Sequence, residues 1–221
     1  MQSTESDSSA ARASDAVAFS AADGLSKGER TRARLVHSML ELIQLNGYSG
    51  TGLAAVTEHA GAPKGSMYFH FPDGKEGLGA AAVELAQAQF EELLREAAQS
   101  EGSVAGSVRA VIAAVATIVS ESDYRLGCPV SVVTLEMGAE SDRLRATCER
   151  AFSSWIEPTA GLLGSEGLSA ADALSLATAI VAAVEGAVVL SRAMRTTQPL
   201  ESTADLLADM IAMRAGQVAE A

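Results

Sequence analysis

The chain has 221 residues, of which 48% are hydrophobic and 4% aromatic, and its formal net charge is −12. It is long enough to bury a sizeable core, and its two cysteines, Cys128 and Cys148, provide neither a disulfide framework nor a metal-ligand spacing. Abundant alanine and leucine with only five prolines favour an all-α fold. We interpret both cysteines as free thiols, which favours a cytoplasmic protein.

Charge is unevenly distributed along the chain. Residues 1–24 hold one arginine against four acids, residues 25–80 hold six lysines and arginines against five acids, and residues 81–221 hold nine against nineteen. The middle segment is therefore the part best suited to an anionic partner, and the acidic remainder would discourage non-specific adhesion to DNA. The arginines of residues 25–80, taken alone, are equally consistent with a solvent-exposed helix face.

The N-terminal part of the chain predicts a tail followed by a helix. Residues 1–25 are rich in Ser, Ala and Asp and lack the pattern of a signal peptide, so we expect a disordered tail. The next segment carries apolar residues at helical spacing, namely Leu35, Met39, Leu42 and Ile43. This spacing predicts a first helix over residues 28–46 with Gly47 as its stop.

Two short helices are predicted next, over residues 51–60 and 63–70, with Gly61 at the sharp turn between them. The spacing of Val56, Ala60 and Met67 predicts that these side chains face inward across a helix-turn-helix. The remaining polar side chains of the second short helix are left for its outer face, and these are Lys64, Ser66, Tyr68 and His70.

Phe69 and Phe71 are expected to anchor the second short helix to its own domain, and Pro63 suits the first turn of that helix. Thr51 is expected to cap the helix before it.

The rest of the chain predicts six longer helices, over residues 75–100, 104–121, 128–138, 142–164, 169–195 and 201–215. The first of these is long enough to connect an N-terminal head to a C-terminal body. The most apolar segment, residues 174–190, is shorter than the ~20 residues that span a bilayer and contains Glu185, so we expect a buried helix and no membrane contact.

Three parts of the sequence carry a resemblance to the TetR family of transcriptional regulators. These are TRARLVHSMLELIQLNGY over 31–48, GAPKGSMYFHF over 61–71, and Lys75 at the start of the next helix. PKGSMYFHFPDGKEGL and the later GCPV over 127–130 resemble the LmrA/YxaF-like subgroup, some of whose members are multidrug- or flavonoid-responsive repressors.

The resemblance implies an all-α protein with a three-helix helix-turn-helix head, a long fourth helix and a larger helical body. The expected division is a tail over 1–25, a DNA-binding domain over 26–74, and a ligand-binding and dimerisation domain over 75–221. The partners implied are double-stranded operator DNA, a small-molecule inducer of unknown identity and a second copy of the chain.

The resemblance also implies which residues contact DNA. The candidates are Thr31, Arg32, Thr51, Lys64, Gly65, Ser66, Tyr68, His70 and Lys75. Tyr68 and His70 are expected to bond phosphates, and Lys75 to place its charge with a helix N-terminus on a phosphate. The alternative is that Tyr68 and His70 are core residues of a helical bundle.

In this family the body encloses a largely apolar cavity, and here its candidate liners are Phe90, Ile118, Met137, Phe152, Trp155, Val184 and Glu185. Each apolar member fits plain core packing as well. Trp155 offers both apolar area and an N–H group. Glu185 is expected either to pair with an arginine such as Arg192 or to face a polar group of the ligand or of a partner subunit.

The helix over 169–195 is apolar around more than half its circumference, which predicts a second packing surface and a homodimer. The small residues that would allow close approach are Ala182, Ala183, Gly186 and Ala187. A monomer with this helix at its centre is the alternative.

Two other function classes stand beside the regulator. One is a non-catalytic helical dimer that acts through protein partners, and the other is a helical-bundle enzyme. The histidines show no acid-x-x-His relation, and no P-loop, G-x-S-x-G or Cys-His cluster occurs, so we expect no enzyme, no cofactor and no metal.

Overall fold

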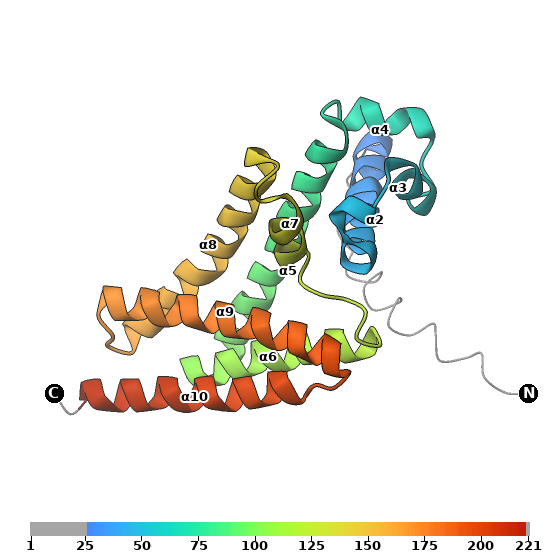
Figure 1. Cartoon of the computed structure of the whole chain (residues 1–221). Coiled ribbons are helices and arrows are strands. Elements are labelled where there is room, and N and C mark those ends of the chain that lie inside the picture. The colour runs from blue at the N-terminus through green and yellow to red at the C-terminus, as the bar shows by residue number, and fades with distance from the viewer. Residues whose placement is uncertain (1–25, 220–221) are drawn as a thin grey trace, which may run out of the picture.

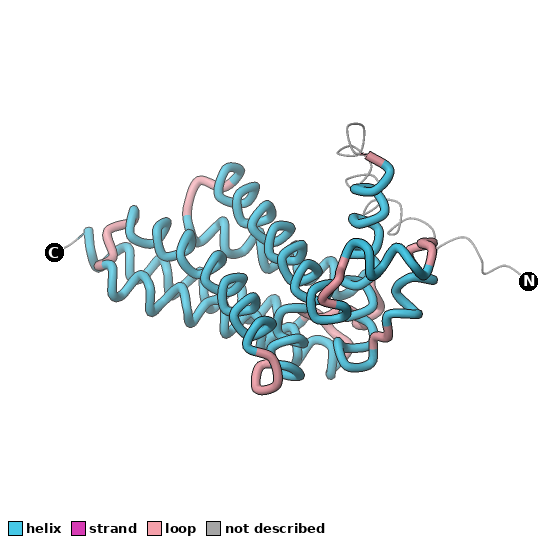
Figure 2. The backbone as a smooth tube through the Cα atoms, turned by 90° about the horizontal axis from the view of Figure 1, so that it is seen from above, coloured by secondary structure: helices cyan, strands magenta, loops and turns pink. Residues whose placement is uncertain are grey.

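The structure is a computed structural model that describes residues 26–219, apart from the side chains of Lys64 and of residues 215–219. Within this range it contains helices and loops and no strands (Figure 2). The helices are α2 (Lys27–Gly50), α3 (Leu53–His59), α4 (Lys64–His70), α5 (Gly74–Ser100), α6 (Val104–Glu121), α7 (Pro129–Met137), α8 (Asp142–Ser165), α9 (Ala170–Met194) and α10 (Gln198–Ala219). The all-α prediction is confirmed, while the tail predicted over 1–25 lies outside the described residues.

The helices form a small head and a larger body (Figure 1). The head consists of α2, α3 and α4, and α5 runs obliquely from the head into the body, where it packs against α8. α6, α9 and α10 cross the far end of the molecule, with α10 farthest from α4. The chain therefore places its candidate DNA-reading segment and its most apolar helices at opposite ends.

Local sequence explains how α2 begins and ends. Ser26 caps the helix: its hydroxyl accepts from the Glu29 N–H at 3.3 Å, and the Glu29 carboxylate accepts from the Ser26 N–H at 2.7 Å. Helical geometry breaks at Gly47, whose φ of 79° and ψ of 165° suit glycine. The predicted stop at Gly47 is thus confirmed as a kink, after which one more turn leads to Gly50.

The helix-turn-helix packs mostly as predicted. Val56, Ala60 and Met67 are buried, and the turn between α3 and α4 has Gly61 at a φ of 56°. Phe71 is buried as expected, but Phe69 is 82% exposed, so the prediction that it anchors α4 is wrong. Met67 and Phe71 lie one turn apart on the inner face of the helix. Phe69 lies midway between them in the sequence and therefore points away from that face.

The first of two hydrophobic cores runs from the head into the body without interruption. Leu35 and Met39 of α2 belong to the same buried cluster as Leu78 of α5 and Trp155 of α8. The second cluster lies at the far end, where α6, α9 and α10 meet, and includes Ile112 and Ile211. Because protein interiors are close-packed, a shift of α5 at one end of the first cluster must be accommodated at the other.

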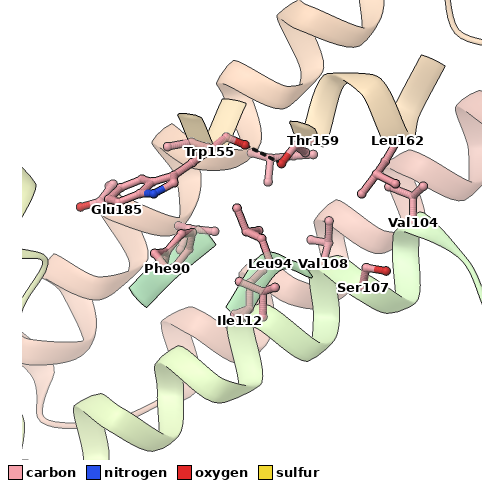
Figure 3. Close-up of a pocket in the computed structure, with 14 residues that line it drawn as sticks. Phe90, Leu94, Val104, Ser107, Val108, Ile112, Trp155, Thr159, Leu162 and Glu185 are labelled. Carbon is pink, nitrogen blue, oxygen red and sulfur yellow. Dashed lines mark hydrogen bonds between the residues drawn. The ribbon is translucent and has the colours of Figure 1, made fainter. Parts of the chain in front are cut away.

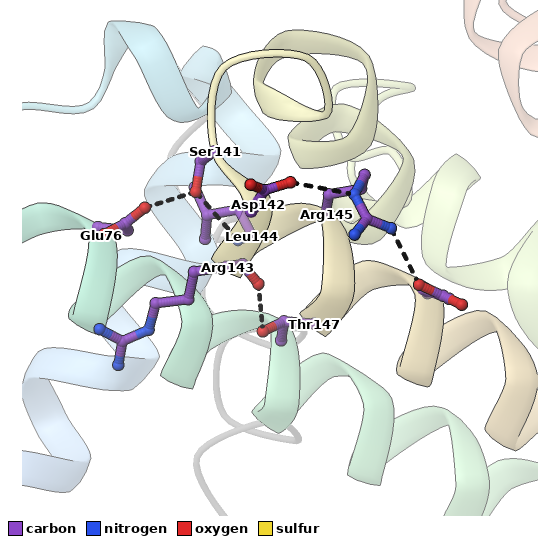
Figure 4. A network of polar contacts seen from close by, with 8 residues as sticks. Glu76, Ser141, Asp142, Arg143, Leu144, Arg145 and Thr147 are labelled. Carbon is purple, nitrogen blue, oxygen red and sulfur yellow. Dashed lines mark hydrogen bonds and ion pairs between the residues drawn. The ribbon is translucent and has the colours of Figure 1, made fainter.

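Polar contacts tie the start of α8 to the start of α5 (Figure 4). Ser141 caps α8 by accepting from the Leu144 N–H at 3.1 Å, and its hydroxyl donates to the carboxylate of Glu76. Arg143 pairs with Asp73 at 2.7 Å. The head-proximal ends of the two helices are therefore held together.

The predicted helix boundaries hold within three residues at most starts and ends. The largest difference at a start is α10, which begins at Gln198 and not at 201, because the first turn of a helix tolerates Pro199. α6 and α9 are long and apolar enough to cross a membrane by length and composition, and one third of each apolar window is buried inside the molecule.

We expect Gly47→Ala to destabilise the fold by about 1–3 kcal/mol, because the backbone conformation at Gly47 is strained for any residue with a Cβ. The added methyl group would also displace the carboxylate of Glu136. Gly50→Ala is the matched control, since Gly50 has ordinary space around its Cβ position. Chemical denaturation of both variants measures the difference, and equal stabilities would contradict the assignment of strain to Gly47.

Candidate nucleic-acid interface and internal cavity

α4 presents an exposed face at the outer end of the head. Tyr68 is 64% exposed, Gly65 is exposed and Ser66 is partly exposed, while Met67 and Phe71 hold the helix to the core from the other side. The exposed face therefore combines a phenol, a hydroxyl and a bare backbone segment. Such groups bond phosphate oxygens and base edges, and a glycine lets the backbone approach a duplex.

Further polar and cationic groups border this face. The guanidinium of Arg32 lies 5.1 Å from the centre of the Phe71 ring, and the ring of His70 meets the edge of Phe69 at 5.0 Å between centroids. Thr31 is partly exposed, and its hydroxyl donates to the carbonyl of Lys27. Lys64 begins α4, but its side chain lies outside the described part.

Lys75 lies at the junction of head and body. Its ammonium group donates to the carbonyl of Ser49 at 3.3 Å and lies 4.5 Å from the centre of the Tyr48 ring. Partial burial lowers the pKa of Lys75, and the negative charge of Glu136 opposes that shift.

One predicted DNA contact, Thr51, lies differently from expectation. Thr51 is 1% exposed and its hydroxyl donates to the carbonyl of Gly47, so it does not cap α3, whose N-cap is Gly52. Burial removes Thr51 from direct contact with a phosphate. Ser66 stays at the surface, where its hydroxyl donates to the carbonyl of Pro63.

Two cavities in the described part of the body meet at shared residues. The first, which we call the body cavity, has a volume of about 50 Å³ and lies between α5, α6, α8 and α9 (Figure 3). The second, the head-side cavity, has a volume of about 260 Å³ and extends to Leu40 and Gln44 of α2. The head-side cavity approaches the roughly 300–1,000 Å³ of small-molecule sites, and the body cavity is smaller. Their shared lining residues are Phe90, Trp155, Val184 and Glu185.

The structure brings together five of the seven predicted cavity residues. Those four shared residues are joined by Ile118, which lines the head-side cavity. Phe152 and Met137 do not line either cavity. Phe152 packs edge-on against Trp155 at 5.4 Å between ring centroids, and Met137 packs against the first hydrophobic core.

The carboxylate of Glu185 faces α7. It accepts from the hydroxyl of Ser131 at 2.5 Å and from the thiol of Cys128. Burial, followed by the negative charge of Glu185, raises the pKa of the Cys128 thiol well above its ordinary range. Of the two alternatives expected for Glu185, the pairing with Arg192 is not formed in the described structure, because Arg192 donates instead to the carbonyl of Arg125 at 3.1 Å.

Sequence reasoning missed the role of α7, which connects the cavity to the head. Ser131 near its start bonds Glu185, and Glu136 near its end accepts from the Ser49 N–H at 2.6 Å. Glu136 thus bonds the N–H of the residue whose carbonyl accepts from Lys75. No local signal marks these residues, because each contact joins positions far apart in the sequence.

Comparison with known proteins agrees with this geometry. Residues 35–82 match the family model described as bacterial regulatory proteins, tetR family, and residues 104–206 match the C-terminal domain of LmrA/YxaF-like transcriptional regulators. The HTH-type transcriptional regulator YxaF of Bacillus subtilis is 31% identical over 175 residues, which cover 79% of this chain and 91% of YxaF. The chain belongs to the TetR family of transcriptional regulators.

Other members of the family show the same extent of similarity. The HTH-type transcriptional regulator LmrA of Bacillus subtilis is 29% identical over 181 residues, covering 82% of this chain and 96% of LmrA. The crystal structure of a TetR regulatory protein from Rhodobacter sphaeroides superposes with a TM-score of 0.72 at 28% identity and covers 80% of this chain and 96% of that one. The chain is accordingly a DNA-binding regulator and not an enzyme.

Proposed function

We propose that this TetR-family regulator is a cytoplasmic repressor that binds a near-palindromic operator as a homodimer and is released by a small apolar or aromatic inducer. In this proposal residues 26–74 bind DNA, and residues 75–221 bind the inducer and the second subunit. The observation that carries it is the course of α5, which begins beside the exposed face of the head at Lys75 and continues to Phe90 in the cavity wall.

The proposed DNA contacts are the exposed groups around α4. Tyr68, Gly65 and Ser66 come from α4 itself, Thr31 and Arg32 border it from α2, and His70 and Lys64 lie at its two ends. Lys75 adds a positive charge at the start of α5. Exposure of Tyr68 supports this role over the alternative of a core residue.

Substitution of Tyr68 and of Lys75 tests whether these residues contact DNA, and for Tyr68 whether it is instead a core residue. We expect Tyr68→Phe to cost about 1.5–3 kcal/mol of operator affinity with unchanged stability, because only a hydroxyl bonded to a charged partner is lost. Lys75→Ala should weaken binding to all sequences and lower the salt slope by about one unit. Fluorescence anisotropy against salt measures both effects.

Arg95→Ala is the control for the salt experiment, since it removes a cation near the body end of the same helix. An unfolded Tyr68→Phe protein, or a salt slope for Lys75→Ala equal to that of the control, would contradict the assigned contacts.

An exposed apolar face on α9 and α10 supports the proposed dimer. Leu190 is 54% exposed, Ala182 and Gly186 are exposed, and Leu206 and Met213 of α10 are 69% and 64% exposed. Small residues on α9 allow a second helix to approach closely, and burying two helices from each subunit makes a four-helix bundle. We assign this face to subunit contact and not to lipid, because the relatives are DNA-binding regulators.

Gly186→Glu tests this face without disturbing the monomer, because nothing lies within 4 Å of the added Cβ. We expect the variant to be monomeric in size-exclusion chromatography with light scattering and to lose affinity for a palindromic site, whose half-sites must lie about 34–36 Å apart for paired heads. Gly161→Glu on α8 is the matched control, since its Cβ position is equally open. A dimeric Gly186→Glu protein would place the interface elsewhere.

Two physical connections support release by a ligand. α5 forms part of the cavity wall and of the head core, and α7 bonds Glu185 at one end and the Ser49 peptide beside Lys75 at the other. A ligand must prefer the DNA-incompetent arrangement of the heads, because equal affinity for both arrangements shifts nothing. A coupling free energy of about 1–3 kcal/mol corresponds to a loss of operator affinity of about 5- to 150-fold.

Reciprocity provides the test of this coupling. We expect an inducer to lower operator affinity by some factor and saturating operator to lower inducer affinity by the same factor. Trp155, the one tryptophan of the chain, reports ligand binding through its fluorescence, and labelled operator reports DNA binding through anisotropy. A ligand that changes Trp155 emission without changing operator affinity would leave the body as a binding site without regulatory effect and favour control through a protein partner.

A further inference from the structure

The lining of the two cavities carries a single kind of charge. Among the residues that line them in the described part of the chain, Glu185 is ionisable as an acid and no lysine, arginine or histidine is present. The other polar lining side chains are neutral, namely Ser107, Thr159, Gln44, Gln89 and Cys128. The cavities therefore offer a ligand an apolar surface with one carboxylate at the place where they meet.

This carboxylate has no counter-ion within the described structure. Its two hydrogen-bond donors, Ser131 and Cys128, are uncharged. The arginine on the same helix, Arg192, directs its guanidinium to the carbonyl of Arg125 and lies against Gly127. The ion pairs found in the body are formed by surface residues such as Arg109 with Asp205, so none neutralises Glu185.

Aromatic rings lie beside the same carboxylate. Phe90 and Trp155 line both cavities, with ring centroids 4.6 Å apart and planes tilted by 50°. In Figure 3 Phe90 of α5 and Trp155 of α8 lie on the Glu185 side of the body cavity, while aliphatic side chains of α6 surround its other end. Aromatic faces attract cations through the quadrupole of the ring, most strongly in desolvated sites.

We infer that the inducer is an amphiphilic monocation, with an apolar body in the cavities and an amine or quaternary ammonium group beside Glu185 and the rings of Phe90 and Trp155. This inference rests on the proposed function, since it names the chemical class of the inducer at that site. A carboxylate accepts more hydrogen bonds than its two neutral donors supply, so a protonated ligand amine can donate to Glu185 without displacing Ser131 and Cys128. A quaternary ammonium group has no N–H and would be held by the charge of Glu185 and by the aromatic rings.

The opposite charge is disfavoured by the same arrangement. An anionic ligand would bring a second negative charge beside Glu185 with no basic group to bind it, and like charges in a site of low dielectric repel strongly. A neutral ligand with a hydroxyl group can bond Glu185 but lacks the charge attraction. The expected order of affinity is therefore cation, then neutral compound, then anion.

A matched series of probes tests this order. The compounds are 6-phenylhexylamine, 6-phenylhexan-1-ol and 6-phenylhexanoate, which share one apolar body and differ in the charge of the end group. Titration followed by Trp155 fluorescence should show the amine binding about 10- to 100-fold more tightly than the alcohol, the range expected for a hydrogen bond to a charged group. Equal or tighter binding of the alcohol or the carboxylate, or no binding by any probe, overturns the inference.

Glu185→Gln identifies the residue responsible. The substitution should reduce amine affinity by about 10- to 100-fold and change alcohol affinity by less than about threefold. Glu157→Gln is the matched control, because it removes one exposed carboxylate from α8 outside both cavities. An amine preference that survives Glu185→Gln overturns the inference, and the ranking of the probes on the unsubstituted protein remains decisive if that variant fails to fold.

Operator release separates this inference from the proposed function. Release of labelled operator by the amine, with weaker release by the alcohol, supports both. Amine binding that changes Trp155 emission but leaves operator affinity unchanged refutes the regulatory proposal while the cation preference stands. Release by the alcohol or the carboxylate as readily as by the amine refutes the cation preference while regulation stands.

Discussion

The packing of α5 is the constraint on which the rest of the molecule depends. Leu78 and its neighbours on α5 complete the core of the head, and Phe90, about three turns after Leu78, forms part of the wall of both cavities. Because the first hydrophobic core is continuous from α2 to Trp155, the head has no separate core on which it can move independently of the body. A change in the cavity that shifts α5 must therefore change the position of the head or open a gap in the core, and a gap costs about 24 cal/mol for each Å³.

Polar contacts restrict the same helix at its DNA-proximal end. Asp73 and Glu76 bond the start of α8, while Lys75 between them bonds the opposite neighbour, the Ser49 peptide. Three residues within four positions thus fix the start of α5 both to the body and to the head. α8 carries Trp155 and α2 carries Leu40, so the two elements joined there also line the head-side cavity.

The sequence predicted the parts of this arrangement that depend on local pattern. Helix positions, the break at Gly47 and the inward positions Val56, Ala60 and Met67 follow from periodicity and backbone preference, and the structure agrees with them. Recognition of the family followed from a short motif, and matches to relatives over most of the chain length confirm it.

The features that the sequence did not predict depend on contacts between distant segments. The burial of Thr51 follows from the kink at Gly47, whose carbonyl accepts its hydroxyl proton, and a capping role looked equally suitable from sequence alone. Phe69 was expected to be buried because it is apolar, yet its angular position on α4 decides its exposure. Ser131 and Glu136 carried no signal, because their partners lie 54 and 87 residues away.

The free energy of the hydrogen bonds around Lys75 can be compared with the free energy needed to couple ligand binding to DNA binding. A hydrogen bond to a charged group contributes about 1.5–3 kcal/mol, and the coupling between two sites in regulated proteins is typically about 1–3 kcal/mol. The free energy of the single bond between Glu136 and the Ser49 N–H is therefore of the same size as the coupling proposed between ligand and DNA binding. Glu136 also places a negative charge near the ammonium group that is proposed to bind phosphate. A movement of α7 that alters this one carboxylate would change the charge available to DNA without any large rearrangement of the fold.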